Sequence, residues 1–277
     1  MKKTSVSFSF VQFSIVWGDS IKNIEKLDQL LSGYKRGDTD CIVLPEMFPT
    51  GFTMTPEVHA EPCDGPALNW MKEKSKSLDC CFCGGICVSE NGQFYNRLYW
   101  VTPEGLVLQY DKRHLFRMAG ENQHYSAGTE KIYPVIKGWR VLPLICYDLR
   151  FPIWSRNRWK KNDDVWEGEY DVLLYIANWP ESRKYAWKQL LLARAIENQS
   201  FVIGVNRIGI DGNNIRHAGE SFAVNPLGEF LHRSTKEKEE VFKITLEPDF
   251  LAELRSKFPV GMDADSFTIS EEEPHAK

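Results

Sequence analysis

Apolar and polar residues alternate near the N-terminus, where Val6, Phe8 and Phe10 are separated by single serines. An alternation with a period of two residues predicts a β-strand with one buried face. The pattern changes to a helical period over residues 20–31, and Gly33 follows as a residue suited to end a helix. The apolar face of this helix is expected to consist of Ile21, Ile24, Leu27 and Leu31.

Four further elements follow from the same kinds of pattern. Residues 40–45 are a short apolar run that predicts a buried strand, and residues 68–78 have the spacing of a helix. Residues 81–89 and 95–102 predict two strands, and the Glu-Asn-Gly-Gln segment between them is a hairpin signal. Strands and helices in alternation, followed by paired strands, predict an α/β fold.

The second half of the chain repeats the pattern of the first half. The matching pairs are 39–48 with 170–179, 82–88 with 201–207, and 97–108 with 220–231, and a helix is expected over 182–198. Such a repeat predicts two similar α-β-β halves related by a pseudo-twofold axis, with two sheets face to face and helices outside. No segment has the composition of a linker, so residues 1–277 are expected to form one domain with a polar tail from about Ser270.

Composition and charge narrow the range of partners. The chain has 277 residues and a formal net charge of −4, and this mildly acidic balance gives no reason to expect nucleic acid. No stretch approaches the ~18–20 apolar residues of a membrane span. The basic start at Lys2 and Lys3 lacks the apolar region and cleavage site of a signal peptide, so we expect a cytoplasmic protein.

Seven cysteines, an odd number, favour reduced thiols over a disulfide framework. Cys80, Cys81, Cys83 and Cys87 lie close enough in sequence to be considered as metal ligands. Their segment has the pattern of a buried strand, however, and cysteine packs as a small hydrophobe. Neighbours in a strand also point to opposite faces. We therefore expect this cluster to pack in the core, with no metal site.

Cys146 is the most informative single residue for function. It lies where the apolar run of 141–145 meets a polar turn, at a place that a small molecule can reach. A thiol is a weak nucleophile unless a base removes its proton. Glu46 ends another apolar strand, and Lys112 follows a strand and a turn. A thiol, a carboxylate and a cation at strand ends are the components of an acyl-transfer site.

Five motifs, in this order along the chain, show a family resemblance. They are L-P-E-M-F-P-T-G-F-T-M (44–54), Y-D-K-R-H-L-F (110–116), E-N-Q-H-Y-S-A-G (121–128), I-C-Y-D-L-R-F-P (145–152) and A-R-A-I-E-N-Q (193–199). The chain resembles the nitrilase, or carbon–nitrogen hydrolase, superfamily, and is most similar to the omega-amidases. The resemblance covers the chain from the first strand to about Pro259. It implies a four-layer α-β-β-α sandwich, which the internal repeat supports independently.

Four residues are expected to share the acyl-transfer chemistry with Cys146. Glu46, desolvated at the end of its strand, is expected to accept the thiol proton. Lys112 and the backbone N–H of Tyr147 are expected to bind the oxyanion that forms on thiolate attack. The resemblance implies that Glu121 is a second glutamate, which orients Lys112 or the substrate amide. We prefer a glutamate base to a Cys–His pair, because His114 lies beside Lys112 and no histidine lies in the motifs around Glu46 and Cys146.

Several residues near these motifs have two interpretations. Three aromatic residues either wall the acyl pocket or belong to the core: Phe52, Phe116 and Trp179. Asp148 and Arg150 are expected to form an ion pair that fixes the turn after the strand, whereas the alternative is that Arg150 binds a substrate carboxylate. Arg113 and His114 are interpreted as structural.

The expected function is the hydrolysis of a small linear amide through a cysteine thioester, with release of ammonia and with no metal or organic cofactor. The resemblance implies an omega-amidase that acts on 2-oxoglutaramate or 2-oxosuccinamate. One alternative is another amidase of the superfamily or an N-carbamoyl amino acid hydrolase. A catalytically silent binding subunit is a further alternative, which the presence of Glu46, Lys112 and Cys146 disfavours. The superfamily also implies a homodimer or a larger homo-oligomer.

Overall fold

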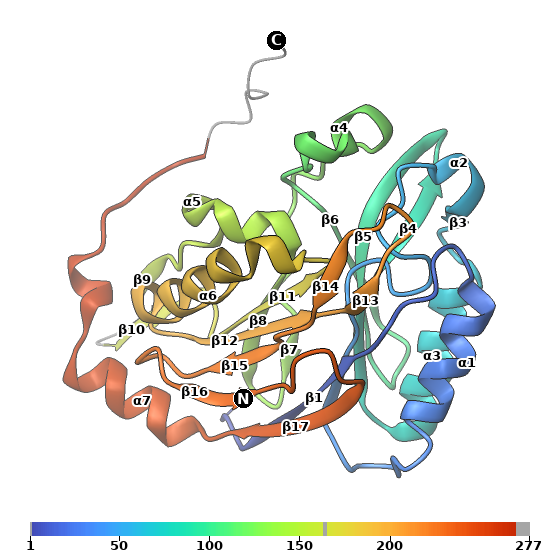
Figure 1. The fold of residues 1–277 in the computed structure, drawn as a ribbon. Helices are drawn as coiled ribbons and strands as arrows, with labels where there is room; N and C mark the ends of the chain where they lie inside the picture. Colours follow the sequence, from blue (N-terminus) through green and yellow to red (C-terminus); the bar gives the residue numbers. More distant parts are fainter. Residues whose placement is uncertain (1, 163–164, 270–277) are drawn as a thin grey trace.

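Two β-sheets lie face to face, and helices cover their outer sides (Figure 1). The computed structural model describes residues 2–162 and 165–269. The polar tail expected from Ser270 lies outside the described residues. Within the described ranges, no helix combines the length and the apolar character that a membrane span requires.

The two sheets have the same strand order around their centres, as the internal repeat predicts. The first sheet consists of β17 (Glu240–Leu246), β1 (Val6–Gln12), β2 (Cys41–Val43), β4 (Cys81–Glu90), β5 (Gln93–Val101) and β6 (Val107–Asp111), with β3 (Glu61–Pro62) beside β4. The second consists of β16 (Phe230–Arg233), β15 (Phe222–Val224), β12 (Phe201–Asn206), β11 (Val172–Ala177), β8 (Trp139–Ile145) and β7 (Val135–Ile136). β1, β2 and β4 are parallel, as are β8, β11 and β12. The predicted pseudo-symmetric sandwich is confirmed.

Three longer helices lie outside the sheets: α1 (Ser20–Leu30) and α3 (Pro66–Leu78) on the first, and α6 (Lys184–Asn198) on the second (Figure 1). The remaining elements are α2 (Pro56–His59), α4 (Glu121–His124), α5 (Pro152–Ser155), α7 (Pro248–Lys257), η1 (Arg117–Ala119), η2 (Cys146–Arg150), η3 (Glu181–Arg183), η4 (Val260–Asp263), β9 (Trp159–Asn162), β10 (Val165–Gly168), β13 (Ile208–Ile210) and β14 (Arg216–Ala218).

Alternation along the strands assigns side chains to two cores. In β2 and β4, Cys41, Val43 and Cys83 pack in the core between the sheets. Ile42 and Phe82, one residue along, pack in the core between the first sheet and its helices. A strand buried on both faces has this near-continuous apolar sequence, because each face meets a different layer.

One expectation for α1 is wrong. Ile21, assigned to the buried face, is 72% exposed, whereas Asn23 is fully buried. The Asn23 side chain donates hydrogen bonds of 2.7 Å to the carbonyls of Val16 and Pro49, and so connects the helix to the loop after β2. A buried amide with partners can replace an apolar side chain on a helix face, and apolar periodicity alone does not reveal it.

Candidate active site

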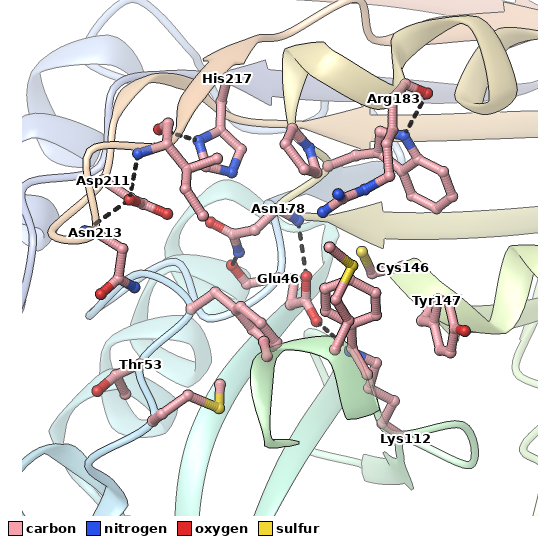
Figure 2. A pocket seen from close by; sticks show the side chains of 18 of the residues that line it. Glu46, Thr53, Lys112, Cys146, Tyr147, Asn178, Arg183, Asp211, Asn213 and His217 are labelled. Carbon is pink, nitrogen blue, oxygen red and sulfur yellow. Dashed lines mark hydrogen bonds and ion pairs between the residues drawn. The ribbon is translucent and has the colours of Figure 1, made fainter. Parts of the chain in front are cut away.

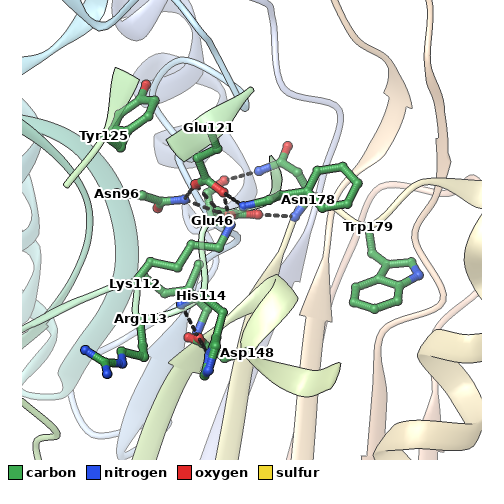
Figure 3. A network of polar contacts seen from close by, with 12 residues as sticks. Glu46, Asn96, Lys112, Arg113, His114, Glu121, Tyr125, Asp148, Asn178 and Trp179 are labelled. Atoms are coloured by element: carbon green, nitrogen blue, oxygen red, sulfur yellow. Dashed lines mark hydrogen bonds and ion pairs between the residues drawn. The ribbon is translucent and has the colours of Figure 1, made fainter. Parts of the chain in front are cut away.

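The candidate residues come from strands of both sheets, near their carboxyl ends. Glu46 lies three residues after β2, and Lys112 directly follows β6. Cys146 directly follows β8, and Glu121 begins the short helix α4. Open α/β sheets place ligands at the carboxyl ends of their parallel strands. Figure 3 shows that Glu46, Lys112 and Glu121, which are far apart in the sequence, meet there.

Close packing between β4 and the turn after β2 fixes the backbone of Glu46. A Cβ atom on Gly85 would lie 3.0 Å from Glu46 Cα and 2.9 Å from Met47 N. Glycine permits this approach, which any larger residue would prevent. Met47 itself has a φ of 43°, in the left-handed region. The chain therefore turns sharply next to the carboxylate, and strand β4 holds the turn in place.

Lys112 connects the two glutamates. Its Nζ donates to Glu46 Oε1 at 2.9 Å and to Glu121 Oε2 at 3.0 Å, and all three side chains are at most 1% exposed. Burial alone lowers the pKa of Lys112, but Glu121 and Glu46 raise it above its ordinary value. Burial raises the pKa of Glu121, and Lys112 opposes that shift. The lysine therefore stays charged although its side chain is buried.

Two asparagines complete the surroundings of Glu46, and sequence reasoning assigned a role to neither. Asn96 Nδ2 donates to Glu46 Oε1 at 2.8 Å and to Glu121 Oε1 at 2.9 Å. The backbone N–H of Asn178 donates to Glu46 Oε2 at 2.7 Å, and its Nδ2 donates to the Glu46 carbonyl at 2.5 Å. Both carboxylate oxygens are thus fixed. In the repeat of 39–48 with 170–179, Asn178 lies one position after the equivalent of Glu46, near the end of the matching strand, and this was a usable signal. Asn96 had no such signal.

Cys146 has the geometry of an exposed nucleophile on a tight turn. Its φ is 42°, in the left-handed region that non-glycine residues rarely adopt, and its side chain is half-buried. Burial raises the pKa of the thiol well above its ordinary value, and Glu46 raises it further, whereas Lys112 lowers it. The resting thiol is therefore protonated at neutral pH. A nucleophile in this state needs a base at the moment of attack.

A pocket of about 610 Å³ opens over Cys146, Glu46 and Lys112 (Figure 2). The four residues proposed to contact substrate all line it: Phe52, Phe116, Tyr147 and Trp179. The Phe52 ring lies 4.9 Å from Lys112 Nζ, and the rings of Phe116 and Tyr147 pack edge to face at 5.0 Å. All three aromatic residues thus line the pocket, and Trp179 is also part of the hydrophobic core.

The expected ion pair between Asp148 and Arg150 is wrong. The Asp148 carboxylate is fully buried and accepts hydrogen bonds from the Tyr110 hydroxyl at 2.7 Å and from the backbone N–H groups of His114 and Ile145 at 3.0 Å. Arg150 is exposed, lines the pocket and lies 5.1 Å above the Trp179 ring. Residues two apart on a 3₁₀ turn face different sides, because only positions three apart are eclipsed.

Two arginines give the mouth of the pocket a positive charge. Arg183, from η3, lines it together with Arg150, and its guanidinium lies 5.2 Å from the Phe116 ring. Within the described residues neither arginine forms an ion pair. His114, in contrast, stacks on Phe151 at 3.8 Å and contacts Asp148 through Nδ1, as its structural interpretation requires.

Comparison with known proteins identifies the family. A family model described as carbon-nitrogen hydrolase matches residues 9–256. The chain belongs to the carbon–nitrogen hydrolase family. Omega-amidase YafV of Escherichia coli (strain K12) is 40% identical over 264 residues, which cover 95% of this chain and 98% of that protein. The 2-oxoglutaramate amidase of Bacillus subtilis (strain 168) is 34% identical over 260 residues, which cover 93% and 96%.

Solved structures agree with this carbon–nitrogen hydrolase fold. The crystal structure of XC1258 from Xanthomonas campestris, described as a CN-hydrolase superfamily protein with an arsenic adduct in the active site, has a TM-score of 0.92 and 40% sequence identity. The match covers 96% of this chain and 99% of that chain. The chain is therefore an enzyme of the nitrilase superfamily that acts on amides, as the motifs indicated.

None of the other six cysteines of this carbon–nitrogen hydrolase lines the pocket. The four clustered ones, Cys80, Cys81, Cys83 and Cys87, are free and buried, at or within β4. Burial raises the pKa of Cys80, Cys81 and Cys87 to about 12, so these thiols are not reactive at neutral pH. In the part of the chain that the structure describes, no group of three or more His, Cys, Asp or Glu side chains is arranged to hold a metal ion.

Proposed function

We propose that this enzyme hydrolyses the terminal amide of small 2-oxo acid amides, such as 2-oxoglutaramate or 2-oxosuccinamate, and releases ammonia. The observation that carries the proposal is the buried Glu46–Lys112–Glu121 triad beside the Cys146 thiol in one pocket. The names of the two relatives, an omega-amidase and a 2-oxoglutaramate amidase, support the same substrate class.

Acylation begins when Cys146 attacks the amide carbon and its thiol proton passes to Glu46. We assign Glu46 Oε2 as the acceptor, because it accepts one hydrogen bond, from the Asn178 backbone N–H, whereas Oε1 already accepts two, from Lys112 and Asn96. A lysine ammonium has three N–H donors. Lys112 Nζ contacts Glu46 Oε1 and both carboxylate oxygens of Glu121. With one N–H shared between the two Glu121 oxygens, the third N–H binds the oxyanion, together with the backbone N–H of Tyr147. Each such donor typically contributes about 2.7–4 kcal/mol to the transition state.

The C–N bond then breaks, and Glu46 returns its proton to the departing nitrogen as ammonia leaves. A thioester remains on Cys146. Water loses a proton to Glu46, attacks the thioester carbon and forms the carboxylic acid, while the C–S bond breaks and the thiolate recovers the proton from Glu46. One carboxylate thus acts in both steps as base and then acid. Glu121 holds Lys112 in place and, through the backbone N–H of Phe116 at 2.6 Å, also fixes the loop over the site.

The charge at the pocket mouth supports an anionic substrate. Arg150 and Arg183 have no carboxylate partner among the described residues, and each rests on an aromatic ring that lines the pocket. Arginine is well suited to bind a carboxylate, because its planar fork donates two parallel hydrogen bonds. A linear ω-amide with a carboxylate at its other end would place that group among these arginines while its amide reaches Cys146.

An ammonia-release panel tests the substrate class. We expect 2-oxoglutaramate and 2-oxosuccinamate to have a higher kcat/KM than aliphatic amides of equal length that lack the 2-oxo acid group. A preference for simple aliphatic amides, or for N-carbamoyl amino acids, would place the enzyme in another branch. No turnover, combined with no unusually reactive thiol among the seven cysteines, would instead indicate a silent binding subunit. A mass increase equal to the acyl group on Cys146, trapped by rapid acid quench, would demonstrate the thioester.

We also propose that the enzyme works in the cytoplasm as a homodimer or larger homo-oligomer. Free thiols at all seven cysteine positions support a reducing compartment. Light scattering of the purified protein at several concentrations would give the oligomeric state.

A further inference from the structure

The pocket has a second polar wall that the proposed chemistry does not use. It is formed by the loop and strand of the β13–β14 hairpin, from which Asp211 and His217 line the cavity. In Figure 2, Asp211 lies on the opposite side of Glu46 from Cys146 and Arg183. The pocket is thus divided: the nucleophile and the arginines lie on one side of the base, and this hairpin wall lies on the other.

Asp211 offers an unused carboxylate oxygen. The side chain is 8% exposed, and its Oδ1 accepts the backbone N–H groups of Asn213 at 2.8 Å and Ile215 at 2.9 Å. Among the described residues, Oδ2 has no hydrogen-bond partner. A nearly buried carboxylate with one oxygen fully used by its own turn and the other free at a cavity is suited to bind a hydrogen-bond donor.

His217 offers a second acceptor. It is 3% exposed, and its Nδ1 lies 3.1 Å from the carbonyl oxygen of Ile215. A carbonyl only accepts, so Nδ1 carries the hydrogen and Nε2 carries a lone pair. Burial lowers the pKa of His217 to about 4, and Arg207 acts in the same direction. The ring is therefore neutral at physiological pH, and Nε2, which has no partner within the described ranges, is an acceptor.

The nearest buried cation does not satisfy Asp211. Arg207 is fully buried, but it donates to the carbonyls of Ile208 and Ile15, both at 3.0 Å. No ion pair between Arg207 and Asp211 is present in the described structure. The wall thus keeps one anionic and one neutral acceptor that face a cavity next to the catalytic base.

The orientation of the substrate in the pocket places the departing nitrogen on the side of this wall. With the carbonyl carbon at Cys146 and the acyl chain toward the arginines, the amide nitrogen faces Glu46, and a substituent on it would extend past Glu46 toward the hairpin. We propose that Asp211 and His217 form a leaving-group subsite that binds an ammonium group on the departing amine. The enzyme would then also cleave N-substituted amides, provided that the amine carries a second, positively charged nitrogen. This inference rests on the proposed amidase mechanism.

Three matched substrates test the subsite: glutaramate, its N-(2-aminoethyl) amide and its N-propyl amide. The last two have similar size and differ in the ammonium group. We expect the wild-type kcat/KM to be at least about tenfold higher for the aminoethyl than for the propyl compound, since a hydrogen bond to a charged group contributes about 1.5–3 kcal/mol. Asp211→Asn keeps Oδ1 for the turn and removes the charge, so it should abolish this preference and leave glutaramate hydrolysis unchanged.

Two further variants complete the test. His217→Leu removes the neutral acceptor at similar volume and should reduce the same preference in part. Asp38→Asn is the control, because Asp38 binds the backbone N–H of Lys35 at 2.7 Å in an exposed turn and does not line the pocket. Equal rates for the two N-substituted amides, no cleavage of either, or a parallel loss for all three substrates in Asp211→Asn would overturn the subsite. Failure of the wild type on every amide, glutaramate and 2-oxoglutaramate included, would overturn the proposed function itself.

Discussion

The two halves of the sandwich end equivalent strands in different ways. β2 of the first sheet leads to Glu46, whereas β11, in the same position of the second sheet, ends directly before Asn178. The two residues meet: the Asn178 backbone N–H and side chain both donate to Glu46. The ends of matching strands, one position apart in the repeat, thus supply a carboxylate in one half and the amide that fixes this carboxylate in the other.

This difference shows that the fold is repeated while the chemistry is divided. The first half provides the charged groups, Glu46, Lys112 and Glu121. The second half provides the thiol of Cys146 and the clamp of Asn178. Neither half contains a complete site, so the packing of sheet on sheet determines the distance between base and nucleophile. Changes on either side should therefore affect activity for different reasons.

The largest loss of activity should follow removal of the nucleophile, which the second half contributes. Cys146→Ala should lower turnover by at least about 10⁴-fold, as removal of a nucleophile does in other hydrolases. The residue is half-buried at a strand end, so the melting temperature should change little. Ammonia release and thermal unfolding of the same preparation provide the two measurements. Activity above trace level in Cys146→Ala would show that the nucleophile is a different group.

Removing the base of the first half should have the next largest effect. Glu46→Gln should lower turnover by about 10²–10⁴-fold per proton-transfer step, and it should also slow alkylation of the Cys146 thiol by iodoacetamide, because the thiol loses its proton acceptor. Glu121→Gln is the matched comparison within the same half. It retains the base, so alkylation should stay near the parent rate while turnover falls about 10–100-fold through a less well-placed Lys112.

The measurement is the rate of alkylation against pH for both glutamate variants, alongside ammonia release. Equal loss of thiol reactivity in the two variants would contradict the division of roles. The two carboxylates, which share Lys112 and Asn96, would then act as one coupled base.

The sequence was sufficient for the frame of the site and for the residues at its strand ends. Glu46 and Cys146 each follow an apolar run, and such a transition is visible without a structure. The repeat predicted two similar halves with two sheets face to face, because alternation and turn signals are local properties. The ion pair predicted from the closeness of Asp148 and Arg150 in the sequence was wrong. The aspartate instead binds Tyr110 of another strand and His114 of the loop after that strand.

Contacts between the sheets were beyond the reach of the sequence. Asn178 and Glu46 are 132 positions apart, and nothing in either segment specifies that their backbones meet. Asn96 is one of several polar residues in its hairpin, and its contact with both glutamates depends on how β5 lies beside β4. The acceptor wall of Asp211 and His217 likewise requires the three-dimensional position of its hairpin. Packing of distant segments, unlike periodicity, leaves no local pattern.

The halves also differ in their cores, and alkaline pH should reveal this. The five buried, non-catalytic thiols all lie in the first half: Cys41, Cys80, Cys81, Cys83 and Cys87. Unfolded thiols ionise near 9.0, whereas burial raises the pKa of Cys80, Cys81 and Cys87 to about 12. Unfolding therefore releases protons above pH 9. Below pH 9 the thiols should not change the free energy of unfolding. It should then fall toward pH 12, by at most about 1.4 kcal/mol per pH unit for each thiol.

Urea unfolding at pH 8 to 11 measures this slope. Cys80→Ala provides the control, because it removes one thiol and leaves the buried tyrosines that also titrate. A slope identical in parent and variant would show that the thiols do not contribute.

A smaller effect should follow from shortening one of these core side chains. Cys83 is fully buried in the core between the sheets. Cys83→Ala should lower the free energy of unfolding by about 1–2 kcal/mol, because it leaves a small cavity, and it should keep activity. Cys63→Ala, at a half-buried position near Glu90, should cost less. Loss of activity in Cys83→Ala at unchanged stability would mean that this thiol has a role in the chemistry.

We expect no effect on activity or stability when metal ions are removed. If the first-half cysteines only pack, EDTA or a stronger zinc chelator should alter neither ammonia release nor melting temperature. A structural metal contributes directly to folding free energy, and a metal-activated water is lost with its metal, so either role would appear in one of the two measurements. The clustered cysteines are spread over three groups of buried side chains: Cys81 and Cys83 lie in the core between the sheets, Cys80 lies in the core beneath the helices, and Cys87 packs with Met47 and Tyr125. This arrangement suits packing better than a single ligand set. The contrary result would be a fall in ammonia release or melting temperature on chelation that added zinc reverses. If Cys80→Ala did not respond to the chelator, the first half would carry a metal site as well as the base.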